Sequence, residues 1–303
     1  MRLNEQLAVF EEAILNLIDR DYVYLDVPGY FNVGDSLIYC GAMAVLGKCP
    51  YRCVYQSVVE NVVDRKIPKD AIIVLNGGGN WGDCFYTPFR NRIVSTFPEN
   101  KIIFMPQTIR YYDETGLERD AALYTKHPNL HLCVRDEHSF EILKTYFSSN
   151  HIYLLPDASV GLCDVFPKWT DQQQNKALFF KRSDDEAALE AWDVQNADAK
   201  DWDTVLEEVH FNRVLYPYMG IRKIKKMLGS DFMKGIANKY LVSVIEPFFM
   251  KKIPAYLQRY NKLYTTRLHG LILAKLMGMP VEYQDTRFGK ISGYSETWFK
   301  NDL

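Results

Sequence analysis

The sequence predicts an α/β fold in which parallel sheets of the doubly wound kind are divided between two domains. Short apolar runs, rich in β-branched and aromatic residues, alternate with segments of helical character, which is the order expected of βαβ units. The length of 303 residues favours two domains, and 48% hydrophobic residues are ample for a sizeable core. Polar residues directly follow several predicted strands, at the edge where doubly wound sheets bind ligands.

The charge balance argues against a nucleic-acid-binding protein. The 36 Lys and Arg residues nearly cancel the 38 Asp and Glu residues, for a net charge of −2, whereas nucleic-acid binders usually show a basic excess. Residues 1–17 carry Glu5, Glu11 and Glu12 within an apolar pattern, which predicts an amphipathic helix and not a signal peptide. Because no run approaches the roughly 18 apolar residues of a membrane span, a cytoplasmic protein is expected.

The six cysteines are scattered singly through the first half of the chain. Only Cys49 and Cys53 lie close together, and no histidine stands at zinc-finger spacing from them. We therefore expect reduced, mostly buried thiols. No set of His and Asp residues at ligand spacing suggests a metal ion.

The first predicted strand, residues 22–27, runs through Pro28-Gly29 into the motif Asn32-x-Gly34-Asp35 and a helix over residues 36–46. A strand, a Gly-containing turn and a helix start form the arrangement that binds phosphates or sugars. The motif is neither a dinucleotide fingerprint nor a Walker loop, because it has a single glycine and no Gly-Lys-Ser/Thr. The alternative is a tight turn capped by Asp35.

Two further strands are predicted over residues 51–57 and 71–75, and the second runs into Asn76-Gly77-Gly78-Gly79-Asn80-Trp81-Gly82-Asp83. Consecutive glycines cost backbone entropy, so they occur where φ is positive or a partner approaches closely. We interpret the run as a ligand-binding loop. The alternative is a simple turn, which needs only one or two glycines.

The next three predicted strands, residues 101–105, 130–134 and 152–155, each end in a polar set. These sets are Pro106-Gln107-Thr108, Arg135-Asp136 and Pro156-Asp157, and a helix over residues 137–146 follows the second. They lie at the edge of the sheet that ligands use. The alternatives are that Arg135 braces its neighbours and that Asp157 caps the next turn.

A polar segment near residues 164–175 marks the predicted boundary, which gives an N-terminal domain over 1–170 and a C-terminal domain over 171–303. The second domain opens with a strand over residues 177–181 that ends in Arg182-Ser183-Asp184. This cluster predicts either an anion site or a solvated helix start. Residues 186–208 are acidic and irregular, so we expect a solvated helix and loop there.

The segment from Arg222 to Lys252 is basic, and apolar residues are interleaved with its cations. Such a segment can rest on an anionic membrane surface. The alternative is an ordinary helix that packs inward and leaves its lysines in water.

The most informative stretch is residues 263–283, where a buried strand breaks at Arg267-Leu268-His269-Gly270 and a helix continues to Met277. Gly278 and Pro280 end this helix. A cation and an imidazole at a helix N-terminus predict an anion site. Further on, Lys290 lies near Tyr294 and Trp298, which suit a sugar face or phosphate, or a tail that folds back onto the body.

The order of these motifs is more specific than any one of them. They are Asn32-x-Gly34-Asp35, Gly77-Gly78-Gly79-Asn80, Arg182-x-Asp184, Thr266-Arg267-Leu268-His269-Gly270, and Gly289-Lys290-Ile291 with Trp298. This order resembles the polysaccharide pyruvyl transferase family over residues 32–298. Two departures concern the acceptor site: Thr266 stands where relatives often have an acid, and residues 284–287 lack an expected Asn.

The resemblance implies two Rossmann-like domains that face each other across a cleft, as in the two-domain (GT-B-like) glycosyltransferases. The donor would be phosphoenolpyruvate, and the product a pyruvate ketal bridging two hydroxyls of a sugar. The acceptor would belong to a lipid-linked precursor of a surface polysaccharide, such as a capsule or exopolysaccharide. No further cofactor is implied.

The residue roles follow the demands of this reaction. Arg182 and Arg267 offer planar forks for the carboxylate and phosphate of the donor, and His269 is the candidate proton donor. Gly270 and Lys290 complete the donor side. The acceptor side comprises Asn32, Gly34, Asp35, Gly78, Gly79, Asn80, Asp83 and Asp184, and Asp35, Asp83 and Asp184 remain alternatives for the general base.

Two other functions compete with this interpretation. A nucleotide-sugar-dependent glycosyltransferase of similar fold would need a glutamate or a ribose-binding pair near the second-domain loop, whereas Arg182 and Arg267 favour a smaller, doubly charged donor. A non-catalytic protein that binds a glycan or a phosphorylated metabolite would bind without turnover.

Overall fold

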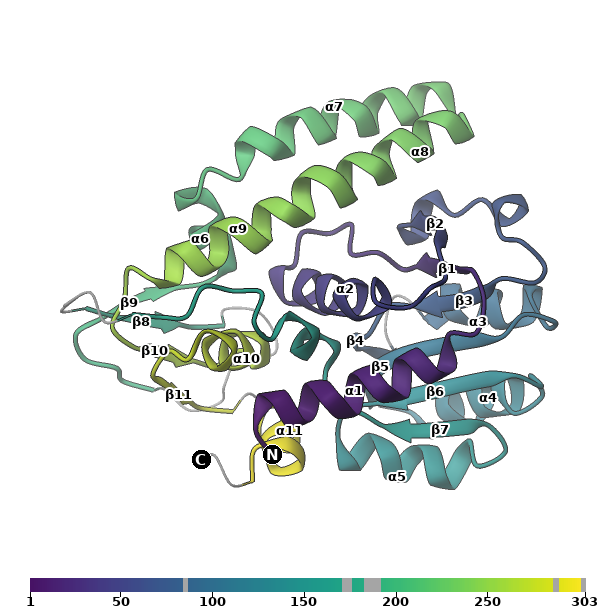
Figure 1. The fold of residues 1–303 in the computed structure, drawn as a ribbon, viewed down its shortest axis with the longest axis horizontal. Helices are drawn as coiled ribbons and strands as arrows, with labels where there is room; N and C mark the ends of the chain where they lie inside the picture. Colours follow the sequence, from purple (N-terminus) through teal and green to yellow (C-terminus); the bar gives the residue numbers. More distant parts are fainter. Residues whose placement is uncertain (84–86, 171–175, 183–191, 286–288, 301–303) are drawn as a thin grey trace. The chain divides into compact units, whose positions relative to one another are not determined.

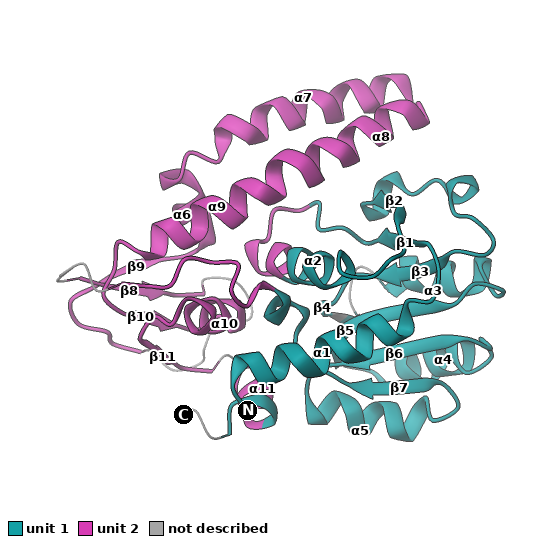
Figure 2. Ribbon diagram, viewed as in Figure 1, with its two compact units in different colours: residues 1–29, 38–161, 297–303 teal, residues 30–37, 162–296 magenta. Residues whose placement is uncertain are grey.

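The computed structural model describes residues 1–83, 87–170, 176–182, 192–285 and 289–300 (Figure 1). The chain forms two compact units (Figure 2). Unit 1 comprises residues 1–29, 38–161 and 297–303, and unit 2 comprises residues 30–37 and 162–296. The resemblance implies a cleft between two domains. Such a cleft depends on how the two units are placed relative to each other, and it stays a prediction.

Unit 1 is built on a parallel sheet with the strand order β2-β1-β3-β5-β6-β7, and β4 pairs with β5. Its strands are β1 (Tyr22–Leu25), β2 (Cys53–Ser57), β3 (Ile72–Leu75), β4 (Gly78–Gly82), β5 (Ile102–Arg110), β6 (Leu130–Val134) and β7 (His151–Leu154). Its helices are α1 (Leu3–Leu17), α2 (Val33–Leu46, which starts in unit 2), α3 (Thr87–Thr96), α4 (Glu114–Tyr124) and α5 (Glu137–Tyr146). Strands β1, β3 and β6 are buried along their whole length, as expected when helices cover both faces of a parallel sheet.

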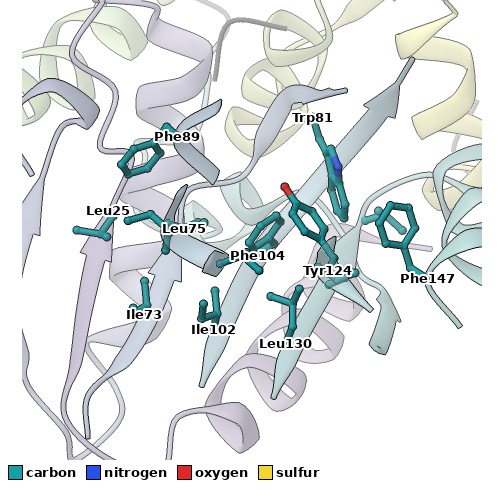
Figure 3. Close-up of a cluster of buried hydrophobic side chains, with 14 of the residues drawn as sticks. Leu25, Ile73, Leu75, Trp81, Phe89, Ile102, Phe104, Tyr124, Leu130 and Phe147 are labelled. Carbon is teal, nitrogen blue, oxygen red and sulfur yellow. The ribbon is translucent and has the colours of Figure 1, made fainter. Parts of the chain in front are cut away.

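Four aromatic rings pack edge to face or tilted at the centre of the core of unit 1 (Figure 3). The ring of Trp81 lies 5.2 Å from that of Phe104 and 5.6 Å from that of Phe147, and Tyr124 lies 5.5 Å from Phe104. Trp81 belongs to β4, so its side chain joins the segment after the glycine run to the core.

The glycine run forms a strand in the structure and not the loop that the sequence suggests. A Cβ on Gly77 would lie 2.7 Å from the Pro106 carbonyl oxygen, and one on Gly82 would lie 1.7 Å from the Arg110 carbonyl oxygen. Gly78 and Gly82 have φ of 131° and 127°, which L side chains rarely adopt. Close chain packing and positive φ therefore explain these three glycines. Strand β5 correspondingly extends through Pro106 to Arg110, beyond the predicted end at residue 105.

Unit 2 has a smaller parallel sheet with the order β11-β10-β8-β9. Its strands are β8 (Ala177–Phe180), β9 (Ala197–Lys200), β10 (Leu263–Thr265) and β11 (Val281–Tyr283). Its helices are α6 (Trp202–Glu208), α7 (Asn212–Leu228), α8 (Asp231–Tyr240), a π-helical segment (Leu241–Ile245), α9 (Glu246–Leu257), α10 (Leu268–Met277) and α11 (Lys290–Trp298, which ends in unit 1). Strand β9 and helix α6 correct the prediction of a solvated helix and loop over residues 186–208. The polar edge strand β9 has no fully buried residue, so its sequence lacks the apolar signal of a strand.

The described helices include none with the length and apolar character needed to cross a membrane. The cysteines among the described residues form no disulfide. Burial raises the pKa of the Cys133 thiol, which keeps this side chain protonated.

Acidification is expected to destabilise unit 1 through His131. Burial, followed by the neighbouring His151 ring stacked at 4.5 Å, lowers the pKa of His131 from 6.5 to about 4. The unfolded chain then binds more protons than the folded one between these values, so the free energy of unfolding decreases as the pH falls through this window. Urea unfolding from pH 7 to pH 4 measures the slope. His131→Asn should flatten it and the exposed His138→Asn should not; equal slopes in all three proteins would contradict the assignment.

Candidate functional site at two helix N-termini

The N-terminus of α10 lies directly behind a buried strand end. The side-chain oxygen of Thr265, the last residue of β10, accepts a hydrogen bond from the Arg267 backbone N–H at 3.0 Å. A Cβ on Gly270 would lie 2.5 Å from that same oxygen and 3.1 Å from the Phe180 ring. Glycine at position 270 therefore allows the first turn of α10 to press against the end of the sheet. The predicted helix, including its end at Gly278 with φ of 72°, is confirmed.

His269 contacts the Asn32-x-Gly34-Asp35 motif within unit 2. A Cβ on Gly34 would lie 2.4 Å from His269 Nδ1 and 2.9 Å from its Cγ, so the half-buried imidazole packs on the Gly34 backbone. Gly34 is in the first turn of α2 and His269 is in the first turn of α10. The N-terminal turns of two helices thus meet at this imidazole. Each contributes partial positive charge, which favours an anion at this place.

The motif itself starts α2 three residues earlier than the sequence predicts. The Asn32 side-chain oxygen accepts a hydrogen bond from the Gly34 N–H at 2.9 Å, and the Asn32 carbonyl accepts one from Ser36 at 3.1 Å. Asn32 is therefore the capping residue, in place of the suggested Asp35. Asp35 lies in the first helical turn with only 6% of its surface exposed. The sequence assigns this motif to the first domain, whereas its contacts place it in unit 2.

The loop before the motif is held by aromatic packing. Phe31 has a φ of 61°, and its ring contacts Phe211 at 5.4 Å and Tyr218 at 5.7 Å, both in edge-to-face geometry. These rings belong to the start of the α7 region, so the loop and that helix are joined within unit 2.

Arg267 is held by an acidic partner that the sequence did not identify. Its Nε donates to Asp201 Oδ1 at 2.6 Å and its Nη2 to Oδ2 at 2.7 Å, a two-pronged ion pair with both side chains less than one-fifth exposed. Asp201 also accepts from the Trp202 N–H at 2.8 Å at the start of α6. The pair fixes the plane of the guanidinium and offsets part of its charge. From the sequence, Asp201 was expected to be one of the solvated acids of residues 186–208. What sets it apart from the other acids is its place at the N-cap of α6, which starts at Trp202.

Arg182 follows β8, the strand that pairs with β10. Its backbone N–H donates to the Thr266 side-chain oxygen at 2.8 Å, next to Arg267. The two arginines therefore follow the carboxyl ends of two strands, as the sequence predicts, and the structure shows that these strands are adjacent. Asp184 lies outside the described residues.

The C-terminal aromatic residues follow the second alternative given by the sequence, a tail that folds back onto the body. Tyr294 and Trp298 are 1% and 6% exposed, and the Trp298 indole N–H donates to the Arg135 carbonyl at 2.9 Å within unit 1. Trp298 thus packs back onto the body, and neither ring offers a face to a sugar. Lys290 is the half-buried first residue of α11, and Asp285 accepts hydrogen bonds from the following N–H groups of Ile291 and Ser292.

The polar sets of unit 1 brace the chain. Arg135 forms a buried ion pair with Asp157, and its Nε donates to Thr108 Oγ1 at 2.9 Å. The Thr108 hydroxyl in turn donates to Asp136 at 2.8 Å. The bracing alternative thus accounts for Arg135, and Asp157 also accepts from the Ser159 N–H at 2.9 Å.

The remaining predicted acceptor residues also belong to unit 1. Asp83 accepts from the backbone N–H groups of Tyr112 and Asp113 at 2.6 and 3.1 Å, which closes its turn onto the end of β5. Gly78 and Gly79 lie in β4, and the side chain of Asn80 is outside the described structure. Across the described residues, no group of three or more His, Cys, Asp or Glu side chains is placed to hold a metal ion.

Comparison with known proteins gives three kinds of match. The family model described as polysaccharide pyruvyl transferase matches residues 32–281. The putative pyruvyl transferase EpsO of Bacillus subtilis is 33% identical over 293 residues, covering 95% of this chain and 89% of the relative. Pyruvyl transferase 1 of Schizosaccharomyces pombe is 25% identical over 287 residues, with 89% and 68% covered.

A solved structure matches the fold. It is that of an uncharacterized protein of Klebsiella pneumoniae, with a TM-score of 0.57 and 17% sequence identity. The match covers 96% of this chain and 94% of the other. At this identity the likeness concerns the fold alone.

Proposed function

Because the chain belongs to the polysaccharide pyruvyl transferase family, we propose that it transfers the enolpyruvyl group of phosphoenolpyruvate onto two hydroxyls of one sugar. The acceptor in this proposal is a lipid-linked precursor of a surface polysaccharide. The observation that carries the proposal is the meeting of two helix N-termini at His269, where Gly34 and the imidazole are in contact. A small donor with two anionic groups suits such a place.

The donor is proposed to bind at the start of α10. Phosphoenolpyruvate carries a carboxylate and a phosphate, and the free N–H groups of a helix N-terminus accommodate one of them. Arg182 and Arg267, at the ends of the paired strands β8 and β10, supply positive charge for the other. Asp201 keeps Arg267 in one orientation, so little side-chain entropy is lost when the donor arrives. Gly270 and Lys290 complete the proposed donor side.

His269 is proposed to donate a proton to the methylene carbon of the donor. The second carbon then has oxocarbenium character, and the first sugar hydroxyl attacks it while a carboxylate takes the hydroxyl proton. The second hydroxyl displaces phosphate and closes the ketal. In the net reaction, one of the two hydroxyl protons makes up for the proton that His269 gave to the new methyl group. The other hydroxyl proton leaves with the phosphate.

Asp35 is the carboxylate that we propose as the general base. It is in the first turn of α2, one residue from the Gly34 contact, and it is buried. Asn32 and Gly34 belong to the same turn and are proposed to position the acceptor. Contributions of Gly78, Gly79, Asn80, Asp83 and Asp184 to the acceptor side remain predictions.

The test is phosphate release from phosphoenolpyruvate in the presence of a panel of glycan acceptors. We expect release only with both substrates present and a ketal in the product. Tight binding of uridine nucleotides, measured by calorimetry, would instead favour the glycosyltransferase. Binding of phosphoenolpyruvate without turnover on any acceptor would favour a non-catalytic binding protein.

A further inference from the structure

Helices α7 and α8 form a helical hairpin, residues 212–240, in which they run side by side (Figure 1). Gly229, with φ of 61°, ends α7, and the Ser230 side chain caps α8 by accepting from the Met233 N–H at 3.2 Å. Away from this tip, the rings of Tyr218 and Tyr240 stack at 6.0 Å, and the Tyr240 hydroxyl donates to the Val214 carbonyl at 3.2 Å. The hairpin therefore has a fastened base and a tight two-residue tip.

Both helices of the hairpin expose large apolar side chains. They are Tyr216, Met219, Ile224, Met227, Leu228 and Phe232. Met227 and Phe232, on either side of the tip, are both 76% exposed. Tyr216, Met219 and Met227 fall on one helical face of α7 by their spacing. A gathering of this kind marks a surface that contacts something apolar.

The same hairpin is strongly basic in a chain whose net charge is −2. Residues 212–240 contain seven Lys and Arg residues against one acid, Asp231, and that acid is paired with Lys234 at 3.0 Å. Lys223 and Lys226 are exposed. Lys223 is four residues from both Met219 and Met227, so it lies on the same face of α7, and Lys226 lies next to that face. Two copies of this chain joined through their hairpins would bring like charges together. The combination of exposed apolar side chains and cations instead complements an anionic membrane surface.

We propose that the helical hairpin docks on an anionic membrane, with Met227, Leu228 and Phe232 inserted among the lipid headgroups and Lys223 and Lys226 beside the phosphates. The membrane contact predicted for the basic segment, residues 222–252, is thereby assigned to the tip of the hairpin, where α7 ends and α8 begins. The inward-packing alternative accounts for other residues of the segment, since Met233, Leu241 and Ile245 are buried. The proposal rests on this surface and is independent of the proposed chemistry.

Flotation of the full chain with lipid vesicles tests the docking. Vesicles of phosphatidylcholine alone are compared with vesicles containing phosphatidylglycerol, at low and at physiological salt. We expect binding to the anionic vesicles that weakens with salt. The triple variant Met227→Ser, Leu228→Ser, Phe232→Ser should lose about a hundredfold in partitioning, because three apolar side chains no longer insert. The double variant Lys223→Gln, Lys226→Gln should lose about tenfold or more on anionic vesicles only.

Matched controls separate the hairpin from general surface effects. Tyr112→Ser with Val165→Ser removes two exposed apolar side chains elsewhere, and Lys69→Gln with Lys126→Gln removes two exposed cations elsewhere. Both should bind like the wild type. No binding of the wild type to anionic vesicles at low salt would overturn the proposal, as would equal binding by the triple variant.

Further measurements show whether a loss of vesicle binding comes from misfolding or from dimerisation, and whether the proposed function holds. Circular dichroism and thermal melting show whether the variants fold. If sedimentation showed a wild-type dimer that the triple variant lost, without vesicle binding, the hairpin would be an interface between copies and the proposal would fail. Phosphate release with a water-soluble glycan is measured in the same proteins. If the wild type released no phosphate, the proposed function would be contradicted, but the proposed membrane docking would not.

Discussion

Replacing His269 with Asn is expected to lower the rate of phosphate release by about 10²–10⁴-fold, the usual contribution of a general acid. Asn keeps a polar side chain of similar reach beside Gly34, so the fold should be unaffected, but it has no proton to transfer. Calorimetry with phosphoenolpyruvate should show that the variant still binds the donor. The loss should therefore appear in kcat more than in KM.

The matched control for this variant is His138→Asn, which changes an exposed histidine on α5. Its rate should equal that of the wild type. If His269→Asn turned over as fast as the wild type, the imidazole would not be the proton donor. Loss of donor binding with an unchanged kcat would give His269 a binding role and not a catalytic one.

Replacing Gly34 with Ala is expected to lower kcat by about tenfold to a hundredfold, because misplacing a catalytic group by about 1 Å can have an effect of this size. The new Cβ would lie 2.4 Å from His269 Nδ1, so the imidazole must move away from the helix start. The protein should nevertheless remain folded, since Ala is favoured over Gly inside helices. Activity and thermal stability measured on the same sample distinguish the two effects.

Gly220→Ala provides the control for this substitution. Gly220 also lies within a helix, α7, and a Cβ there would meet nothing within 4 Å. We expect normal activity and a stabilisation of roughly 0.5–1 kcal/mol. If Gly34→Ala were as active as Gly220→Ala, the contact between Gly34 and the His269 imidazole would not contribute to activity.

The sequence predicted the local framework of the site well. The strand over residues 263–265, the break at Arg267 and the helix to Met277 are confirmed, because apolar burial and helix-ending residues act over short distances in the chain. The family resemblance is confirmed by the match over residues 32–281 and by the relative at 33% identity. It rested on the order of motifs, which does not depend on how they pack.

What the sequence did not predict depends on packing between distant residues. The glycine run was expected to be a loop, whereas Gly78–Gly82 form strand β4. Neighbouring carbonyls on β5 and positive φ account for Gly77, Gly78 and Gly82, and the predicted role of the run in acceptor binding stays a prediction. Asp201 looked solvated, since nothing in its surroundings in the chain indicates the arginine 66 residues away that it binds. The Gly34–His269 contact likewise joins two segments that local patterns treat separately.

The backbone at Phe31 bears on how ready the site is before any substrate arrives. A left-handed conformation in a bulky residue is unfavourable by about 1–3 kcal/mol, and edge-to-face ring pairs typically contribute about 0.5–1.5 kcal/mol each. The two contacts of Phe31 with Phe211 and Tyr218 are therefore comparable in size to the strain they oppose. Residues 32–35 begin immediately after this clamped residue, so the turn that meets His269 is shaped during folding. Binding of substrate then has little loop ordering left to accomplish.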